Sequence, residues 1–135
     1  MKVVFDANIF ISALVFPGGQ AEKAMLKIIE GKDTLLISRE IINEVLSVLA
    51  GKFGGDRESL SRLAVNLSEI GRMTETKKRI TFLSDDPDNR VLECASSGGA
   101  YAIITGDKAM LGIGKYGGAR IMSLKEYLRF PRSER

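Results

Sequence analysis

The chain has 135 residues, of which 44% are hydrophobic and 27% are charged, and its formal net charge is +3. This length predicts one domain that buries its own core, and no apolar run reaches the roughly 20 residues that a membrane-spanning helix needs. The single cysteine, Cys94, excludes an internal disulfide, and the absence of histidine excludes Ser-His-Asp and Cys-His catalysis and any imidazole metal site.

The N-terminal half of the sequence alternates short apolar runs with amphipathic segments. The valine-rich run at residues 2–5 is typical of a parallel strand covered on both faces. Asp6 interrupts this apolar start, which does not resemble a secretory signal peptide, so we expect a cytoplasmic protein. The pattern further predicts a helix over residues 7–16, a helix over 20–30, a strand over 34–38, a helix from 39 to about 49 and a flexible turn over 51–56.

The C-terminal half continues this alternation, which favours an α/β domain with helices on both faces of a parallel sheet. We expect one domain over residues 1–130 and a basic tail over 131–135. The predicted elements are a helix over 57–70, extended pieces near 73–75 and 80–83, a polar turn over 84–89, a helix that ends at Gly98 and Gly99, a strand from 101 to Gly106 and Asp107, a short helix around Met110, a strand over 119–122 and a last helix capped by Ser123.

Two acids directly follow predicted strands. Asp6 ends the first strand, and Asp107 ends the strand that starts at residue 101. Ligands of such sheets bind beyond the carboxyl ends of the strands, so these carboxylates meet there if the two strands are neighbours. The turn over 84–89 adds further acids near the same edge. Each acid also has a simpler interpretation, as a helix N-cap or as a turn residue that favours a helix dipole.

Glu44 is a further candidate, because it lies at the margin of an apolar helical stripe. From this margin a carboxylate can reach into a cleft, although most helical glutamates are only solvated. At about 100° per residue the stripe consists of Ile41, Ile42, Val45, Leu46 and Leu49.

Carboxylates that converge without histidine repel one another, and their pKa values rise unless a cation neutralises them. Ligand sets made only of oxygen suit Mg²⁺ or Mn²⁺. One or two such ions can activate a water and offset the charge that develops on a phosphodiester. Several acids on one sheet edge are therefore what a hydrolytic nuclease needs.

Four stretches, in this order, carry a resemblance to a known family: VVFDANIFISAL, LLISREIINEVLSVL, DDPDNRVLECA and AIITGDKAMLGIGKYGGARIMSLKEYL. Over nearly its whole length the chain resembles the PIN domain family, in particular small VapC-type toxins. The resemblance implies a three-layer α/β/α sandwich with a central parallel sheet of about five strands. It implies a ribonuclease that depends on Mg²⁺ or Mn²⁺ and acts on RNA. It also implies a small antitoxin as inhibitor and a homodimer, for which residues 21–29 and 60–67 offer apolar helix faces.

The resemblance assigns catalytic and metal-binding roles to four acids. Asn8 matches the asparagine of the family's Asp-x-Asn start and is expected to orient Asp6 by hydrogen bonds. Thr105 matches the small hydroxyl residue before the last acid. The four matched positions are Asp6, Glu44, an acid between residues 85 and 89, and Asp107.

The third acid departs from the family pattern. Many relatives place an aspartate immediately before the basic residue of this helix, where the present sequence has Asn89 before Arg90. We predict that Asp88 is the ligand, with Asn89 and Asp86 as alternatives. Because Asn89 carries no charge, the number of bound ions, one or two, stays open.

Cations beside the acid edge are candidates for contact with RNA phosphates, which is salt-dependent and blind to sequence. A net charge of +3 permits such a partner without demanding it. The cluster over residues 77–79 and the basic tail are more simply solvated surface. The candidates that flank the acid edge are Arg39, Arg90, Lys108 and Lys115.

Two other functions remain open. The first is a module of the same fold that binds nucleic acid or protein without catalysis. The second is a carboxylate-metal phosphatase. A haloacid-dehalogenase-like enzyme would need a second aspartate two residues after Asp6, and Asn8 at that position counts against it.

Overall fold

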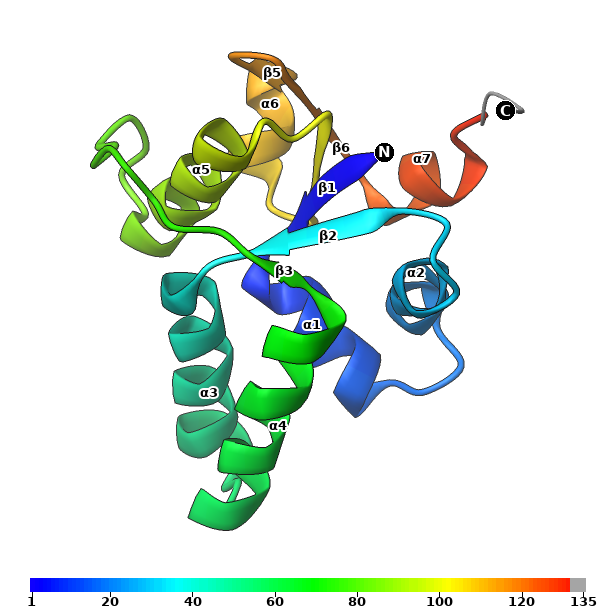
Figure 1. Cartoon of the computed structure of the whole chain (residues 1–135), viewed down its shortest axis with the longest axis vertical. Helices are drawn as coiled ribbons and strands as arrows, with labels where there is room; N and C mark the ends of the chain where they lie inside the picture. The colour runs from blue at the N-terminus through cyan, green and yellow to red at the C-terminus, as the bar shows by residue number, and fades with distance from the viewer. Residues whose placement is uncertain (132–135) are drawn as a thin grey trace.

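Six strands form one sheet in the order β3-β2-β1-β4-β6-β5 (Figure 1). The computed structural model describes residues 1–131, and residues 132–135, the end of the predicted basic tail, lie outside the described residues. All neighbouring strands pair in parallel except β5 and β6. The strands are β1 (Lys2–Phe5), β2 (Thr34–Ile37), β3 (Arg72–Met73), β4 (Ala102–Ile104), β5 (Lys115–Tyr116) and β6 (Ala119–Met122).

Helices cover both faces of the sheet (Figure 1). The chain passes from β1 to β2 to β3 in one direction and then returns across the sheet to β4 and β6. Because such crossovers are right-handed, this reversal places α5 and α6 on the face opposite α1 to α4. The helices are α1 (Ala7–Val15), α2 (Gln20–Ile29), α3 (Arg39–Phe53), α4 (Arg57–Ile70), α5 (Asp86–Gly98), α6 (Lys108–Ile113) and α7 (Leu124–Arg129).

This architecture confirms the predicted three-layer sandwich with a mainly parallel sheet. The strand beyond the expected five is β5, which forms a tight hairpin with β6. Gly117 in that hairpin has a φ of 58°, a left-handed conformation that glycine adopts without steric cost. The reversal of direction falls between β1 and β4, which is the position where open α/β sheets bind their ligands.

Helix boundaries follow the capping residues. Ser38 is the predicted N-cap of α3, and its Oγ accepts a hydrogen bond from the Ile41 N–H at 3.2 Å. The helix continues past the expected end near residue 49 to Phe53, and Gly54 ends it with a φ of 63°. A single glycine inside a helix is tolerated, so residues 51–53 of the turn predicted over 51–56 are helical, and the expectation was wrong for this half and correct for residues 54–56.

Two expectations between β3 and α5 were also wrong. The polar turn predicted over residues 84–89 is largely helical, because α5 already begins at Asp86 with Pro87 in its first turn, where proline is favoured. The extended piece predicted over residues 80–83 pairs with no strand in the described part of the chain. Residues 74–85 instead form an irregular connection from β3 to α5.

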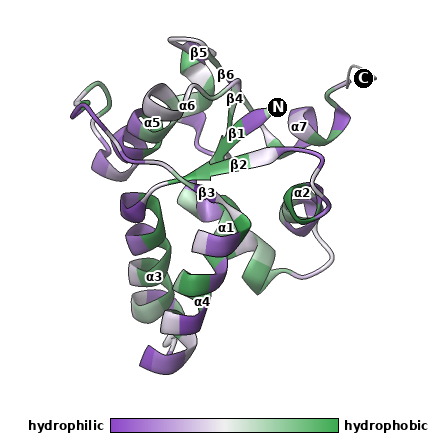
Figure 2. Ribbon diagram, in the orientation of Figure 1, coloured by the Kyte–Doolittle hydropathy of each residue, from purple (hydrophilic) through white to green (hydrophobic). Residues whose placement is uncertain are grey.

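The core lies on both sides of the central strands. Val3, Val4 and Phe5 of β1 are 0% exposed, and Figure 2 shows β1 and β2 in hydrophobic green at the centre of the domain. Cys94 of α5 is also fully buried, which raises the pKa of its thiol to about 12, as fits a core residue. Within residues 1–131, no helix combines the length and the apolar character needed to cross a bilayer.

Candidate functional site

Asp6 and Thr105 lie side by side at the carboxyl edge of the sheet. Strands β1 and β4 pair in parallel with Phe5 opposite Ile104, so the next residue along each strand is Asp6 or Thr105. The hydrogen bonding between the two strands extends to Asp6, whose N–H donates to the Ile104 carbonyl at 3.0 Å. The two strands that carry acids at their ends are therefore neighbours, as the predicted site requires.

The Thr105 hydroxyl joins the two strand-end acids. Its Oγ1 donates to Oδ2 of Asp6 at 2.5 Å and accepts from the Asp107 N–H at 3.0 Å. Thr105 is 0% exposed and Asp6 is 4% exposed, so water does not compete for this contact. The hydroxyl thus holds the Asp6 carboxylate in a defined place relative to the start of α6.

Three helices begin at this edge with an aspartate as N-cap. Oδ1 of Asp6 accepts from the Asn8 N–H at 2.7 Å, and Oδ1 of Asp107 accepts from the Met110 N–H at 3.0 Å. Asp85 precedes α5 but its side chain makes no capping hydrogen bond. Capping therefore leaves one oxygen of Asp107 and both oxygens of Asp85 for other contacts, whereas both oxygens of Asp6 already accept hydrogen bonds, from the Asn8 N–H and from Thr105.

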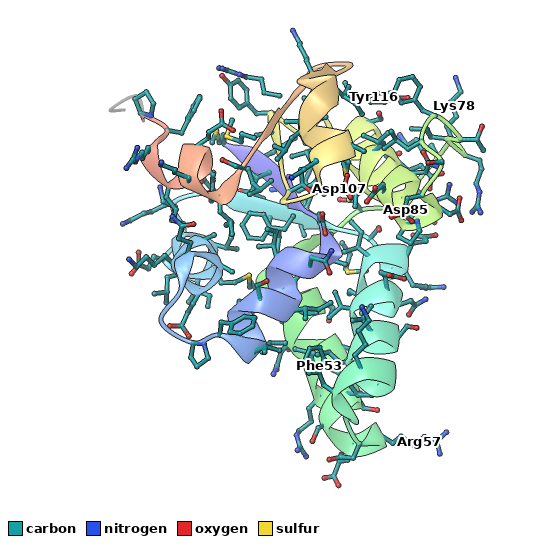
Figure 3. The ribbon with its side chains drawn as sticks, turned by 180° about the vertical axis from the view of Figure 1, so that it is seen from behind. Phe53, Arg57, Lys78, Asp85, Asp107 and Tyr116 are labelled. Carbon is teal, nitrogen blue, oxygen red and sulfur yellow. The ribbon has the colours of Figure 1, made fainter. Side chains whose placement is uncertain are left out.

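Asp85, Asp88 and Asp107 form a compact acid group. One carboxylate oxygen from each of them lies within 4.8 Å of the other two, and Figure 3 shows Asp85 and Asp107 facing the same region. Burial is the main reason why the pKa of Asp88 is raised to about 7, and the charges of Asp107 and Asp85 add to the shift. Asp88 therefore exchanges a proton near neutral pH.

The pKa of Asp6 is raised as well. Burial is again the largest cause, and the charges of Asp107 and Asp85 act in the same direction. The hydrogen bonds from Thr105 and from the Asn8 N–H oppose the shift without cancelling it. Both carboxyl groups are therefore harder to ionise than an exposed aspartate, mainly because they are buried and further because other acids lie nearby.

A cleft of about 240 Å³ opens beside the acid group. Asp6 and Asp88 line it from the sheet edge and α5, and Glu40 and Glu44 line it from α3. Glu44 is half-buried, in agreement with its predicted place at the margin of the apolar stripe. It lines the cleft from α3 and is not one of the three acids whose oxygens lie within 4.8 Å of one another.

The two asparagines of the predicted site have different roles. Asn8 contacts Asp6 through its backbone N–H, while its side chain is exposed at the cleft. Asn89 is 2% exposed, and both of its polar side-chain atoms bind the backbone of Leu83, each at 2.8 Å. Asn89 thus fixes the segment that leads into Asp85, and its side-chain oxygen is already used.

Arg90 is a buried ion-pair partner and not a cation at the rim. Its Nη2 lies 3.1 Å from Glu93 Oε2 and 3.3 Å from Asp86 Oδ1, and it donates to the Ile80 carbonyl at 2.8 Å. Its Nε and Nη1 are buried without a hydrogen-bond partner among residues 1–131. This placement does not fit the predicted contact with RNA. Asp86 likewise pairs with Arg90 and Arg79 and lies outside the acid group.

The other predicted RNA-binding cations are exposed. Lys108 follows Asp107 at the start of α6, and Lys115 lies in β5 beyond the end of that helix. Arg39 begins α3 and lines a second cleft together with Thr74. All three side chains are accessible to a large ligand.

Two acids of the site escaped the sequence-based prediction. Asp85 lies within the interval that the family match indicated, but the predicted ligand was Asp88, with Asn89 and Asp86 as alternatives. The signal for Asp85 is its N-cap position directly before an acidic helix turn. Glu40 lies one helical turn before Glu44 and shares its face, a spacing that could have identified it.

The donor set fits a hard divalent cation. It consists of carboxylate oxygens, which Mg²⁺ and Mn²⁺ prefer as ligands. A cation among Asp85, Asp88 and Asp107 would favour the ionised form of Asp88 and reverse its raised pKa. Asp6, held by Thr105, would complete the negative edge of the cleft.

Comparison with known proteins identifies the family. Residues 2–109 match the sequence profile of the PIN domain. The sequence is 30% identical over 117 residues to "Uncharacterized protein MJ1680" of Methanocaldococcus jannaschii, covering 84% of this chain and 75% of that protein. The fold is similar to VapBC-1 from nontypeable Haemophilus influenzae, with a TM-score of 0.65, 17% identity and coverage of 93% of this chain and 99% of that chain. It is also similar to VapBC2 from Rickettsia felis, solved with a promoter DNA fragment, with a TM-score of 0.64, 10% identity and coverage of 91% and 98%. The profile match over most of the chain and the relative at 30% identity show that the chain belongs to the PIN domain family.

Proposed function

We propose that this protein is a metal-dependent endoribonuclease that hydrolyses RNA phosphodiester bonds. The observation that carries the proposal is the group formed by Asp85, Asp88 and Asp107, whose oxygens lie within 4.8 Å of one another beside a cleft. The raised pKa of Asp88 supports it, because a cation would favour the ionised form of a carboxylate that is buried among other acids. Membership in the PIN domain family supports it independently.

Mg²⁺ or Mn²⁺ is the proposed cofactor, held by Asp85, Asp88 and Asp107. When bound, such an ion supplies activation of a water and neutralisation of charge on a phosphodiester. Asp6, oriented by Thr105, keeps the adjoining wall of the cleft negative. Glu44, which lines the cleft from α3, remains a predicted ligand.

RNA approaches this acidic cleft only if nearby cations offset the repulsion of its phosphates. Lys108, Lys115 and Arg39 are exposed around the site and are proposed to do so. Such contacts make affinity salt-dependent and carry no sequence information. The preference for a particular RNA sequence or structure must then come from other features of the protein surface.

Cleavage of a synthetic RNA by the purified protein in Mn²⁺ tests the proposal. We expect strand cleavage that is lost in EDTA and in the variant Asp107→Asn. A generic phosphomonoester serves as a second substrate. Turnover of the phosphomonoester without RNA cleavage would favour a carboxylate-metal phosphatase, and RNA binding without any turnover would favour a non-catalytic module.

We also propose that the protein acts as the toxin of a type II toxin–antitoxin pair, with a small antitoxin protein as its inhibitor. The two solved structures of similar fold carry the name VapBC, which supports this assignment. Induced expression is expected to arrest bacterial growth, and the Asp107→Asn variant is expected to relieve the arrest. Equal arrest by both forms would contradict a nuclease toxin.

A homodimer is proposed through the apolar faces of α2 and α4. An apolar groove of about 310 Å³ lies between α1, α2 and α4 and supports this surface. Leu14, Leu26 and Ile29 are 51%, 45% and 59% exposed there. Light scattering is expected to give a dimer that Leu26→Glu converts to a monomer, and a monomeric wild-type protein would contradict the proposal.

A further inference from the structure

The connection from β3 to α5, residues 74–85, is held along α5 although it has no regular secondary structure. Side chains of α5 bind the peptide groups of this connection at every third residue, at positions 77, 80 and 83. At positions 80 and 83 the carbonyl is bound as well, by Arg90 and by Asn89 respectively, each at 2.8 Å. The three N–H contacts are Lys77 to Ser97 Oγ at 3.1 Å, Ile80 to Glu93 Oε2 at 2.7 Å and Leu83 to Asn89 Oδ1 at 2.8 Å.

This anchored connection presents cations and one aromatic ring to solvent. The side chains over residues 77–79, two lysines and an arginine, are all exposed, and Phe82 is 61% exposed. In Figure 2 the connection beside α5 alternates between hydrophilic purple and hydrophobic green stretches. The peptide hydrogen bonds on both sides of Phe82 fix the backbone from which its ring projects.

A second aromatic ring completes a small platform. The ring of Tyr116, from β5, lies 5.4 Å from the Phe82 ring between centroids, at an interplanar angle of 52°. Tyr116 follows the exposed Lys115 in sequence. The tilted arrangement pairs the two rings with each other and leaves most of the Phe82 ring accessible, so another flat group can stack on it.

The platform adjoins the acid cleft. Phe82 precedes Asp85 by three residues, so their Cα atoms are at most about 11 Å apart even if the chain between them is extended. Figure 3 shows Tyr116 and Lys78 at the same end of the molecule as Asp85 and Asp107. A strand whose phosphate lies at the acid group therefore has rings and cations within reach.

We propose that the rings of Phe82 and Tyr116, flanked by Lys77, Lys78, Arg79 and Lys115, form a stacking platform for unpaired nucleotides of an RNA strand that enters the acid cleft. The proposal rests on the proposed nuclease function and specifies its substrate as single-stranded RNA. Exposed aromatic rings beside a basic track are the arrangement that binds single strands, because every base has a face that stacks. Duplex RNA keeps its bases stacked internally and cannot use the rings.

Fluorescence anisotropy with a short labelled oligouridylate tests the platform directly. The measurement is made in EDTA, so that no divalent ion is present and the strand stays intact. Phe82→Ala is expected to weaken binding at least about fivefold, whereas Phe82→Trp, which keeps a stacking ring, retains it. Lys78→Ala is expected to lower the salt dependence of binding by about 0.7 in the logarithmic slope.

Phe53→Ala is the matched control. Phe53 is 53% exposed, similar to Phe82, but lies at the end of the molecule opposite Asp85 and Asp107 (Figure 3). Its removal is expected to leave binding unchanged. A labelled RNA duplex is expected to bind the wild type and Phe82→Ala equally.

If Phe82→Ala binds the oligouridylate as tightly as the wild type does, the platform proposal is overturned. The same holds if this variant keeps its RNA affinity and loses binding to a protein partner instead. An equal loss of duplex binding would overturn the preference for single strands. RNA cleavage by the wild type in Mn²⁺ is measured separately. Its absence would overturn the nuclease function while the anisotropy result still decides the platform.

Discussion

The Thr105 hydroxyl donates a hydrogen bond of 2.5 Å to Oδ2 of Asp6, although the two residues are 99 positions apart in the sequence. The same hydroxyl accepts from the Asp107 N–H. One buried side chain thereby sets the distance between two acids that come from different strands. The geometry of the acid edge depends on this contact before any ion binds.

Thr105→Val is expected to lower both stability and metal affinity. The variant leaves Oδ2 of Asp6 buried without its donor, at a cost of about 1 to 3 kcal/mol in the free energy of unfolding. Loss of a residue that orients a ligand typically weakens metal binding about 10- to 100-fold. Urea denaturation and calorimetric Mn²⁺ titration measure the two effects. Thr105→Ser keeps the hydroxyl and should retain Mn²⁺ affinity, and equal affinities for Val and Ser would contradict the orienting role.

Asp85→Asn is expected to weaken Mn²⁺ binding at least about tenfold, because it removes one charge from the acid group. Asp86→Asn is the matched control in the next position. Asp86 is outside the group, 65% exposed on its side chain and paired with Arg90 and Arg79, so its change should leave affinity nearly unaltered. A larger effect for Asp86 than for Asp85 would reverse the assignment of the ligand.

Mn²⁺ affinity is expected to rise with pH up to about 7 and then to level off. Below its folded-state pKa of about 7, Asp88 must release a proton before it binds an ion, so affinity increases up to about tenfold per pH unit. Calorimetric titrations across the pH range measure this dependence. A profile that is flat between pH 5 and 7 (about two pH units) would show that Asp88 does not bind the ion.

The same pKa predicts the pH dependence of stability without metal. The ordinary pKa of an aspartate is about 3.9, so between that pH and about 7 the folded state binds more protons at Asp88 than the unfolded state. This contribution to stability is therefore present at low pH and is lost as pH rises through about 7. Asp88→Asn should abolish this component in urea denaturation, and an unchanged pH slope would contradict it.

Glu93→Gln is expected to destabilise the protein by about 3 kcal/mol or more. Glu93 is 3% exposed and is the buried partner of Arg90, so its loss leaves the buried guanidinium with only the exposed Asp86 as counter-charge. Glu58→Gln is the control, because it breaks an exposed ion pair with Arg62 and should change stability little. Urea denaturation of the two variants measures the difference, and similar midpoints would contradict the structural role of Glu93.

Glu44→Gln tests the predicted ligand that lines the cleft from α3. Glu44 lies outside the acid group, so Mn²⁺ affinity is expected to fall less than in Asp88→Asn. The rate of RNA cleavage is expected to fall in both variants. An equal loss of Mn²⁺ affinity would place Glu44 among the primary ligands.

Much of the fold could be read from local patterns. The strands at residues 2–5 and 119–122 and the helix capped by Ser38 were predicted because apolar periodicity and capping are encoded by neighbouring residues. The errors lie where local signals conflict. Gly51 suggested the end of a helix that continues to Phe53, and the acids around Pro87 suggested a turn where a helix begins.

For the site, the sequence alone determined which acids follow strands and which chemistry remains possible without histidine. Tertiary structure decided the rest, because which carboxylates meet depends on strand order and on helix packing between segments far apart in the chain. Pairing of β1 with β4 brought Asp6 to Thr105, and the start of α5 brought Asp85 beside Asp88 and Asp107. The same packing turned Arg90 inward, where Glu93 supplies the negative partner that a buried guanidinium needs.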